Sequence, residues 1–356
     1  MKRILVTASG GAPAINFTRS LKDSGDKFYL IGCDCDEYSV MRSETDEKYL
    51  VPSANESSYI PAIKKLIKLR DIEFVHAQPD IEVGVISEYR DELGAKTFLP
   101  SRESVRTLRN KYESFKVWKK SGIKVPENIL INSQGDLQKA YGRFGDKIWI
   151  REISGAAGKG SLASPSFALA REWIDSRKGW GRFVAAERLT KQTTTWMALY
   201  KDGKLVVAQG RKRINWLFPD RTQSGVTGIT GVGITISDSL VDDIAQKSIF
   251  AIDGKPNGIF SVDMTYDEDG IPNPTEINIG KFFTTHYFFS KAGLNLPYIY
   301  IKLAFDEPIP EFIKEINPLK EGLLWIRGMD IEPILTNIEE INRIKKLSKE
   351  IYDTDS

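Results

Sequence analysis

Two strand-like segments in the last third of the sequence carry oxygen-bearing side chains at a spacing that could hold a cation. Residues 259–265 (IFSVDMT) and 274–279 (PTEINI) flank a turn-forming Asp-Glu-Asp-Gly sequence at 267–270. If that turn is centred between its last two residues, Asp263 lies opposite Glu276, and Asn278 shares the face of Glu276 because alternate residues of a strand point the same way. Two carboxylates and an amide are hard oxygen donors of the kind that Mg²⁺ prefers. The alternative interpretation is a solvated hairpin whose acids keep a sheet edge soluble.

A second candidate is the small-residue segment 154–161 (SGAAGKGS), which follows a strand-like run that ends in Arg151. Small residues let backbone N–H groups approach phosphates, and a fixed guanidinium can bond two phosphate oxygens. The segment is not a Walker loop, because Ile153 stands where that pattern needs glycine and Gly160 where it needs serine or threonine. We interpret it as a loop that covers phosphates, with a plain hairpin turn as the alternative.

The elements that must position these residues begin with an alternation of strands and helices over the first hundred residues. The apolar pattern predicts strands at residues 4–6, 28–32, 74–76 and 96–99 and helices at residues 15–21 and 59–69. Such alternation predicts a parallel sheet that helices cover on both faces. Asp80 and Glu82 follow the strand at 74–76, at the carboxyl end of the sheet, and we interpret them as surface acids.

The predicted secondary structure changes twice along the rest of the chain. Charged residues at helical spacing predict one helix from Ser101 to about Ser121, and the Gly-Ile-Lys-Val-Pro sequence after it predicts a boundary. Short strands and a helix follow, and then Asp202-Gly203 predicts a hairpin and a change to antiparallel sheet. The predicted units are an N-terminal domain with a connecting helix (1–122), a small lid (123–186), a C-terminal lobe (187–306) and a C-terminal extension (307–356).

Composition limits the class of protein. A chain of 356 residues exceeds what one hydrophobic core usually serves. A net charge of +2 does not favour the binding of a polyanion, so we predict no nucleic-acid partner. Two histidines leave little room for imidazole chemistry, and Cys33 and Cys35 are too close in sequence for a mutual disulfide. No segment approaches the ~20 apolar residues of a membrane span, so we predict a cytoplasmic protein with no membrane partner.

Taken in order, these motifs resemble those of the ATP-grasp enzymes, most of all the carbamoyl-phosphate-synthase branch together with single-chain carboxylate–amine ligases. The similarity spans about residues 2–305. It rests on residues 4–11 (ILVTASGG), 110–115 (NKYESF), Arg151 with 157–160 (AGKG), the hinge-like 187–189 (ERL), and the trio Asp263, Glu276 and Asn278.

The resemblance implies a mixed α/β and α+β architecture, the ATP-grasp fold, with an N-terminal doubly wound parallel-sheet domain, a small lid and a C-terminal antiparallel-sheet lobe. It implies an ATP-dependent ligase that phosphorylates the carboxylate of a small molecule to an acyl phosphate and joins it to an amine, releasing ADP and phosphate. Asp263, Glu276 and Asn278 would hold Mg²⁺, two ions for which Mn²⁺ can substitute, and a homodimer is left open. The ATP-binding residues that it implies are Lys111, Arg151, Ala157, Gly158, Lys159, Gly160, Glu187 and Leu189.

The chain departs from the family pattern at two places. An acid for the ribose hydroxyls often stands about seven positions after the hinge glutamate, where this chain has residues 192–195 (QTTT). The family commonly has arginine two residues after the metal-strand asparagine, and here Lys281 follows one residue later as a point donor. The basic residues Arg211 and Arg213, close to the glycine-rich segment 223–233, are expected to meet the substrate carboxylate. Together with Lys281 they are the candidate catalytic residues, and a solvated basic face is the alternative.

Three other functions are left open. One is activation of bicarbonate or carbamate, as in carbamoyl-phosphate synthases, and another is an ATP-binding module without turnover. The last is an NAD(P)-dependent short-chain reductase, because residues 7–14 (TASGGAPA) resemble a dinucleotide turn and Tyr112 and Lys116 imitate the catalytic pair of that family. A reductase would give no role to the Asp263, Glu276 and Asn278 trio.

Overall fold

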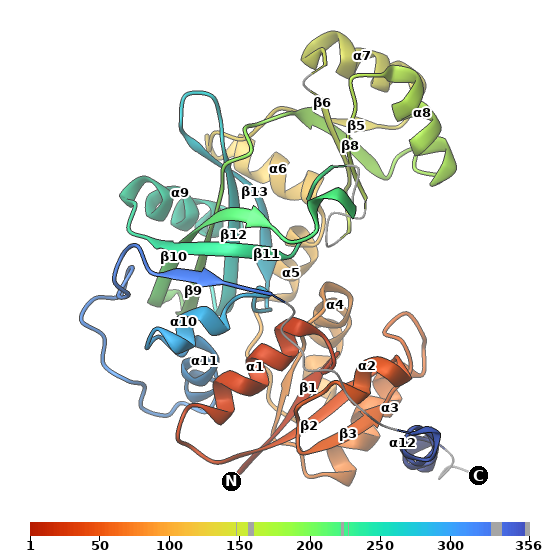
Figure 1. Cartoon of the computed structure of the whole chain (residues 1–356), viewed down its shortest axis with the longest axis vertical. Coiled ribbons are helices and arrows are strands. Elements are labelled where there is room, and N and C mark those ends of the chain that lie inside the picture. The colour runs from red at the N-terminus through yellow and green to blue at the C-terminus, as the bar shows by residue number, and fades with distance from the viewer. Residues whose placement is uncertain (147, 156–159, 222–223, 227, 329–336, 353–356) are drawn as a thin grey trace.

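A parallel sheet of four strands forms the N-terminal domain of the computed structural model, which describes residues 1–146, 148–155, 160–221, 224–226, 228–328 and 337–352 (Figure 1). The strand order is β3-β2-β1-β4. Alternate residues of β1 enter different cores, Leu5 with α3 on one face and Ile4 with α1 on the other, so helices cover both faces as predicted. The elements of this domain are β1 (Lys2–Thr7), α1 (Ala12–Lys22), β2 (Phe28–Asp34), α2 (Glu37–Met41), β3 (Glu47–Leu50), α3 (Tyr59–Leu69), β4 (Phe74–His76), α4 (Asp80–Tyr89) and η1 (Arg90–Glu92).

Two sequence predictions about this part of the chain are wrong. Residues 96–99 form no strand: only Lys96 bridges β4, while Phe98 and Leu99 are buried in the cores. The single helix expected from Ser101 to about Ser121 is two helices, α5 (Arg102–Leu108) and α6 (Lys111–Lys120). The break lies at Asn110, whose side chain accepts hydrogen bonds from the backbone N–H groups of Tyr112 and Glu113 and so caps a new helix.

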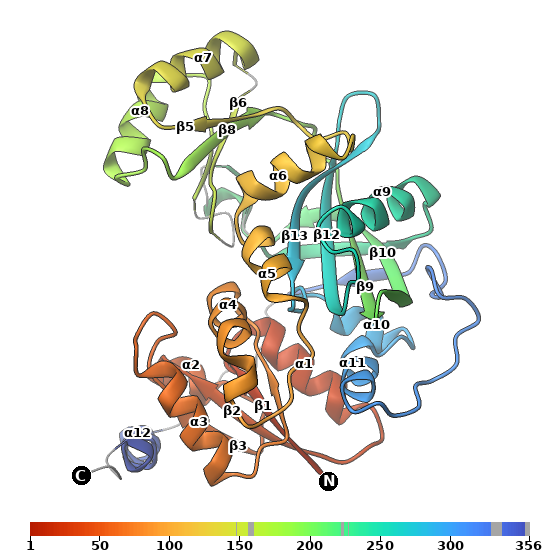
Figure 2. The same cartoon turned by 180° about the vertical axis from the view of Figure 1, so that it is seen from behind.

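The lid is a small antiparallel sheet with two helices on one side, and it stands apart from the rest of the molecule (Figure 2). Its strand order is β5-β8-β6-β7. The lid buries a hydrophobic cluster of its own, which contains Ile150, Leu162 and Phe183. Its elements are β5 (Asn128–Ile131), α7 (Gln134–Phe144), β6 (Ile148–Glu152), β7 (Ser161–Ala163), α8 (Phe167–Ser176) and β8 (Phe183–Glu187).

A six-stranded antiparallel sheet, in the order β13-β12-β9-β10-β11-β14, forms the C-terminal lobe. The predicted hairpin at Asp202-Gly203 joins β9 to β10, and both of its turn residues have a positive φ, which glycine adopts without strain. The elements of this lobe are β9 (Thr193–Lys201), β10 (Lys204–Trp216), η2 (Pro219–Arg221), β11 (Thr230–Ile236), α9 (Ser239–Phe250), β12 (Gly258–Tyr266), β13 (Pro272–Ile279), α10 (Tyr287–Lys291), α11 (Leu296–Ala304) and β14 (Leu324–Ile326).

The N-terminal domain and the C-terminal lobe share two hydrophobic cores, one of which joins Leu5 to Trp196 and the other Phe17 to Met197. The last helix, α12 (Ile338–Tyr352), returns to the N-terminal domain, where the Ser348 hydroxyl accepts a hydrogen bond from the Leu50 backbone at 2.7 Å (Figure 1). These shared cores hold the two larger units together, whereas the lid has its own. Within the described residues, no helix has the length and apolar character that a membrane crossing requires. The domain boundaries remain predictions, although β14 extends the C-terminal sheet beyond residue 306.

Candidate active site

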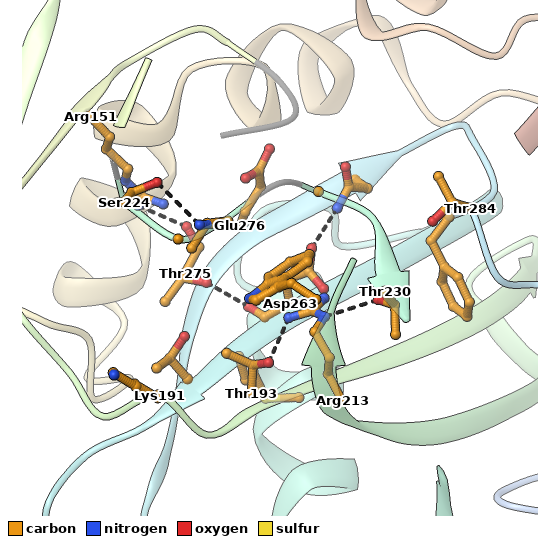
Figure 3. A pocket seen from close by; sticks show the side chains of 18 of the residues that line it. Arg151, Lys191, Thr193, Arg213, Ser224, Thr230, Asp263, Thr275, Glu276 and Thr284 are labelled. Atoms are coloured by element: carbon orange, nitrogen blue, oxygen red, sulfur yellow. Dashed lines mark hydrogen bonds between the residues drawn. The ribbon is translucent and has the colours of Figure 1, made fainter. Parts of the chain in front are cut away.

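A cavity of about 1040 Å³ lies where the three sheets meet (Figure 3). The lid contributes Arg151, and the C-terminal lobe contributes side chains from five of its strands. The N-terminal domain contributes Ala8 and Gly11, from the turn after β1, and the start of α4. This volume is near the upper end of the range for small-molecule sites, so the cavity has room for a nucleotide and a second small molecule.

The oxygen-bearing trio comes together on the β12–β13 hairpin as its spacing predicts. Asp263 lies opposite Glu276, and Ser261 lies opposite Asn278. A register shift follows Asp263 on the side of the turn, so the simple pairing holds only for the half of the hairpin that carries the trio. All three side chains line the cavity. The hairpin therefore faces the cavity instead of forming a solvated edge.

Each member of the trio has a defined partner. The Asp263 carboxylate accepts a hydrogen bond from the Thr195 hydroxyl at 2.5 Å and another from the Asn278 amide nitrogen at 2.8 Å. The Glu276 carboxylate lies 3.1 Å from the Lys111 ammonium, which also donates to the Gly155 carbonyl at 2.7 Å. Lys111 thus reaches the site through Glu276 and is not itself among the described residues that line the cavity.

The donor chemistry of the trio fits a hard divalent cation. The Asn278 amide gives its nitrogen to Asp263, which leaves its carbonyl oxygen as an acceptor beside two carboxylates. Across the described ranges, no three side chains of His, Cys, Asp or Glu gather in a way that could hold a metal ion. A cation at the hairpin would therefore depend on these few protein oxygens and complete its shell with water and phosphate oxygens, as Mg²⁺ commonly does.

Arg211 and Arg213 are not a solvated basic face. Arg211 is 2% exposed, and Arg213 is only partly exposed. Burial lowers the pKa of Arg211 to about 9 and that of Arg213 to about 10, values at which both guanidinium groups remain charged at neutral pH. Lys212, between them, points elsewhere and donates to Gln192. Two guanidinium groups that line one cavity, one of them buried, give it a positive potential that favours an anion.

Hydroxyl groups and aromatic rings hold the two arginines, and the sequence analysis missed both. Arg211 donates to Thr195 at 2.9 Å and to Thr230 at 3.1 Å, and Arg213 donates to Thr193 at 2.5 Å and to Thr230 at 3.0 Å. The signal was present in the alternation of Thr193 and Thr195, which places both on one face of β9, opposite Arg213 and Arg211. Stacked rings complete the support: Arg211 lies over Phe283 and Arg213 over Trp216, at 4.8 and 3.5 Å from the ring centres.

Arg151 enters the cavity from the lid. One of its terminal nitrogens donates to the Thr275 carbonyl at 2.9 Å, next to Glu276. Its Nε is buried and has no partner among the described residues, and burial lowers the pKa of the guanidinium. A buried donor without a partner is costly, so this nitrogen has a hydrogen bond left to give to a ligand in the cavity.

The remaining predicted nucleotide residues occupy the lid and the hinge. Glu187 ends β8, and Leu189 follows it, and both line the cavity. The Gly160 carbonyl accepts a hydrogen bond from the backbone of Glu152 at 2.9 Å, which places it beside β6 without contact to the cavity in the described structure. Ala157, Gly158 and Lys159 lie outside the described residues.

Lys281 does line the cavity, where it pairs with Asp80 at 2.5 Å. Asp80 is therefore a site residue and not a plain surface acid. The second acid interpreted as exposed, Glu82, is 5% exposed, and burial raises its pKa to about 7. His286 is fully buried, with its ring centre 4.9 Å from that of Phe282, and serves packing.

No family model matches the chain, and no curated protein matches it. Several solved structures are similar to the chain. The biotin carboxylase domain of 2-oxoglutarate carboxylase from Hydrogenobacter thermophilus, in complex with MgADP, ADP and bicarbonate, is 16% identical with a TM-score of 0.70, over 91% of this chain and 73% of that one. Carboxyaminoimidazole ribonucleotide synthase from Aspergillus clavatus, complexed with ATP, is 18% identical with a TM-score of 0.66, over 87% and 78%. An L-amino acid ligase from Bacillus licheniformis is 12% identical with a TM-score of 0.66, over 85% and 74%. The chain has the fold of these enzymes.

Proposed function

We propose, from the ATP-grasp fold that the chain shares with these structures, that it is an ATP-dependent ligase which activates a carboxylate as an acyl phosphate and joins it to an amine. The observation that carries this proposal is the meeting, in one cavity, of the buried Arg211 and the partly exposed Arg213 with the Asp263, Glu276 and Asn278 trio. The trio suits the cation that accompanies a nucleotide, and the guanidinium groups suit a second anion.

The residues divide between the two ligands. Glu187 and Leu189 would contact the base, and Lys111 and Arg151 would offset the charge of the phosphates. Asp263, Glu276 and Asn278 would hold Mg²⁺, which supplies charge neutralisation and orientation when bound. Phosphoryl transfer depends mostly on such positioning and electrostatic stabilisation, so no histidine and no covalent nucleophile is required.

Arg211 and Arg213 would hold the carboxylate of the acid substrate, fixed by the hydroxyls of Thr193, Thr195 and Thr230. One oxygen of that carboxylate attacks the γ-phosphorus of ATP, the bond to the β-phosphate oxygen breaks, and ADP leaves. The amine nitrogen then attacks the acyl carbon, a proton leaves the nitrogen, and phosphate departs with its electron pair. Lys281 would stabilise the negative charge that develops on the acyl phosphate.

The extent of the cavity favours this reaction over activation of bicarbonate or carbamate. The cavity continues past the hairpin to Ala8 and Gly11 of the N-terminal domain, which leaves room for an organic acid and an amine. A module without turnover is less well supported, because the trio and both arginines are all present in the cavity. The fold does not support the short-chain reductase alternative.

A phosphate-release screen that crosses carboxylic acids with amines, followed by mass spectrometry of the adduct, tests the proposal. We expect phosphate release that depends on one class of acid and an adduct with the mass of the amide. Release that bicarbonate alone sustains would establish the carbamoyl-phosphate-synthase-like reaction instead. MgATP binding without release from any pair would establish the module.

A further inference from the structure

The wall of the cavity that belongs to the N-terminal domain carries a carboxylate to which the proposed ATP site gives no role. Asp80 is the first residue of α4, which follows the carboxyl end of β4. It lines the cavity, and its side chain keeps 32% of its surface exposed. One of its oxygens accepts a hydrogen bond from Lys281 of the C-terminal lobe at 2.5 Å. The pair thus closes the gap between two domains inside the cavity.

The other carboxylates among the described lining residues are all placed elsewhere. Asp263 and Glu276 lie on the β12–β13 hairpin, Glu187 lies at the hinge, and Asp220 lies in η2 after β10. Among the described lining residues, Asp80 is the acid that the N-terminal domain contributes, whereas Arg211 and Arg213 belong to β10 of the C-terminal lobe. A cavity that takes a carboxylate from one domain and guanidinium groups from another suits two ligand groups of opposite charge.

The backbone next to Asp80 supports a functional role for this wall. Ala8 has a φ of 45°, in the left-handed region that alanine rarely adopts, and it lines the same cavity. Gln78, two residues before Asp80, also lines the cavity and donates to the Phe282 carbonyl at 2.8 Å, one residue after Lys281. Unfavourable backbone conformations persist where the surrounding structure imposes them, and they cluster at ligand sites.

We propose that Asp80 binds the ammonium group of the amine substrate. This assignment rests on the proposed function and names the group that selects the nucleophile. A ligand ammonium would replace the Lys281 ammonium as the counter-charge of Asp80, and Lys281 would then turn to the negative charge of the acyl phosphate. An ammonium has no lone pair, so the Asp80 carboxylate that holds it would also accept one of its protons before the nitrogen attacks. Because Lys281 is the group expected to face the acyl phosphate, an amine held by its neighbour Asp80 lies close to the carbon that it must attack.

The test separates the amine site from acid activation. Hydroxylamine is uncharged at pH 7.5 and traps an acyl phosphate as a hydroxamate, so hydroxamate formation by the wild type measures acid activation. The second nucleophile is the amine that yields most amide from a panel of the twenty L-amino acids and ethylamine. For Asp80→Asn we expect the KM for that charged amine to rise about tenfold to a hundredfold, the range for loss of a hydrogen bond to a charged group, and the KM for hydroxylamine to rise far less. Asp80→Glu, which keeps the carboxylate, should restore most of the wild-type ratio between the KM for the charged amine and the KM for hydroxylamine.

A matched control is available in a second Lys–Asp pair between the same two units. Asp26, in the loop before β2, lies 2.7 Å from Lys302 of α11, away from the cavity. Asp26→Asn should leave both KM values as in the wild type. If Asp80→Asn changes the two KM values by the same factor, or behaves as Asp26→Asn does, Asp80 only joins the domains and the assignment is wrong. If the wild type forms no hydroxamate with any acid, the proposed function fails first and the assignment falls with it.

Discussion

Arg211 and Asp263 are linked through the Thr195 hydroxyl, which accepts from the guanidinium at 2.9 Å and donates to the carboxylate at 2.5 Å. The proposed anion site on β10 and the proposed cation site on β12 therefore meet across β9, the strand between them that carries Thr195. Their opposite charges also support each other, since Asp263 favours the charged form of Arg211 against the effect of burial. Substitutions at this link should affect both sites together.

Thr195→Val tests the link. Loss of the hydroxyl leaves a guanidinium nitrogen and a carboxylate oxygen without that partner, so we expect the free energy of unfolding to fall by about 1–3 kcal/mol, with a loss of ligase activity. Urea denaturation and phosphate release measure the two effects. The matched control is Thr18→Val, because the Thr18 hydroxyl is buried without a partner among the described residues. A change no larger than that of the control would show that the link contributes nothing.

Removal of a trio carboxylate should stop turnover while the fold stays intact. We expect Asp263→Ala or Glu276→Ala to lower ATP turnover at least about a hundredfold, because each removes charge that positions the phosphates. Phosphate release measures turnover, and circular dichroism checks the fold. Asp269→Ala, at the exposed turn of the same hairpin, is the control. Near-normal release by both cavity variants would refute the metal assignment.

Arg151→Ala should weaken MgATP binding. The buried guanidinium has an Nε without a partner among the described residues, so a bound phosphate would supply a partner that alanine cannot replace. We expect the Kd to rise about tenfold to a hundredfold, as for loss of a hydrogen bond to a charged group. Isothermal titration calorimetry measures it. Arg143→Ala, on the exposed side of the lid, should titrate as the wild type does, and an unchanged curve for Arg151→Ala would contradict its phosphate role.

The buried Glu82 should make stability depend on pH. Burial raises its pKa from 4.5 to about 7, so between these values the folded state keeps a proton that the unfolded state loses. Stability then falls by about 3 kcal/mol as the pH rises through this interval, and Glu82 does not change it further below or above the interval. Glu82→Gln should remove this loss.

Urea denaturation at pH 5 and pH 8 measures the effect of Glu82→Gln, with Glu103→Gln at the exposed start of α5 as the control. The variant should lose less stability than the wild type on going from pH 5 to pH 8. Burial also raises the pKa of Asp34, which is present in all three proteins and does not affect the comparison. An equal loss in Glu82→Gln and the wild type would show that Glu82 does not titrate in this range.

The features that the sequence alone determined are local in origin. The period of two along residues 259–279 and the Asp-Gly turn were enough to place Asp263 opposite Glu276, and apolar spacing was enough to predict α3 from Tyr59 to Leu69. The predictions failed where interactions that the apolar spacing does not describe decided the secondary structure. Asn110 begins a new helix by capping it, and residues 96–99 pack their side chains instead of extending a strand.

Only the tertiary structure decided which charges meet. Lys281 and Asp80 are 201 residues apart in sequence, and they pair because shared cores hold the N-terminal sheet against the C-terminal lobe. The environment of Arg211 and Arg213 likewise depends on the threonines of β9 and β11 and on Phe283, which no spacing within β10 could reveal. Secondary structure follows from short-range periodicity, whereas the electrostatics of a cavity depends on every element that encloses it.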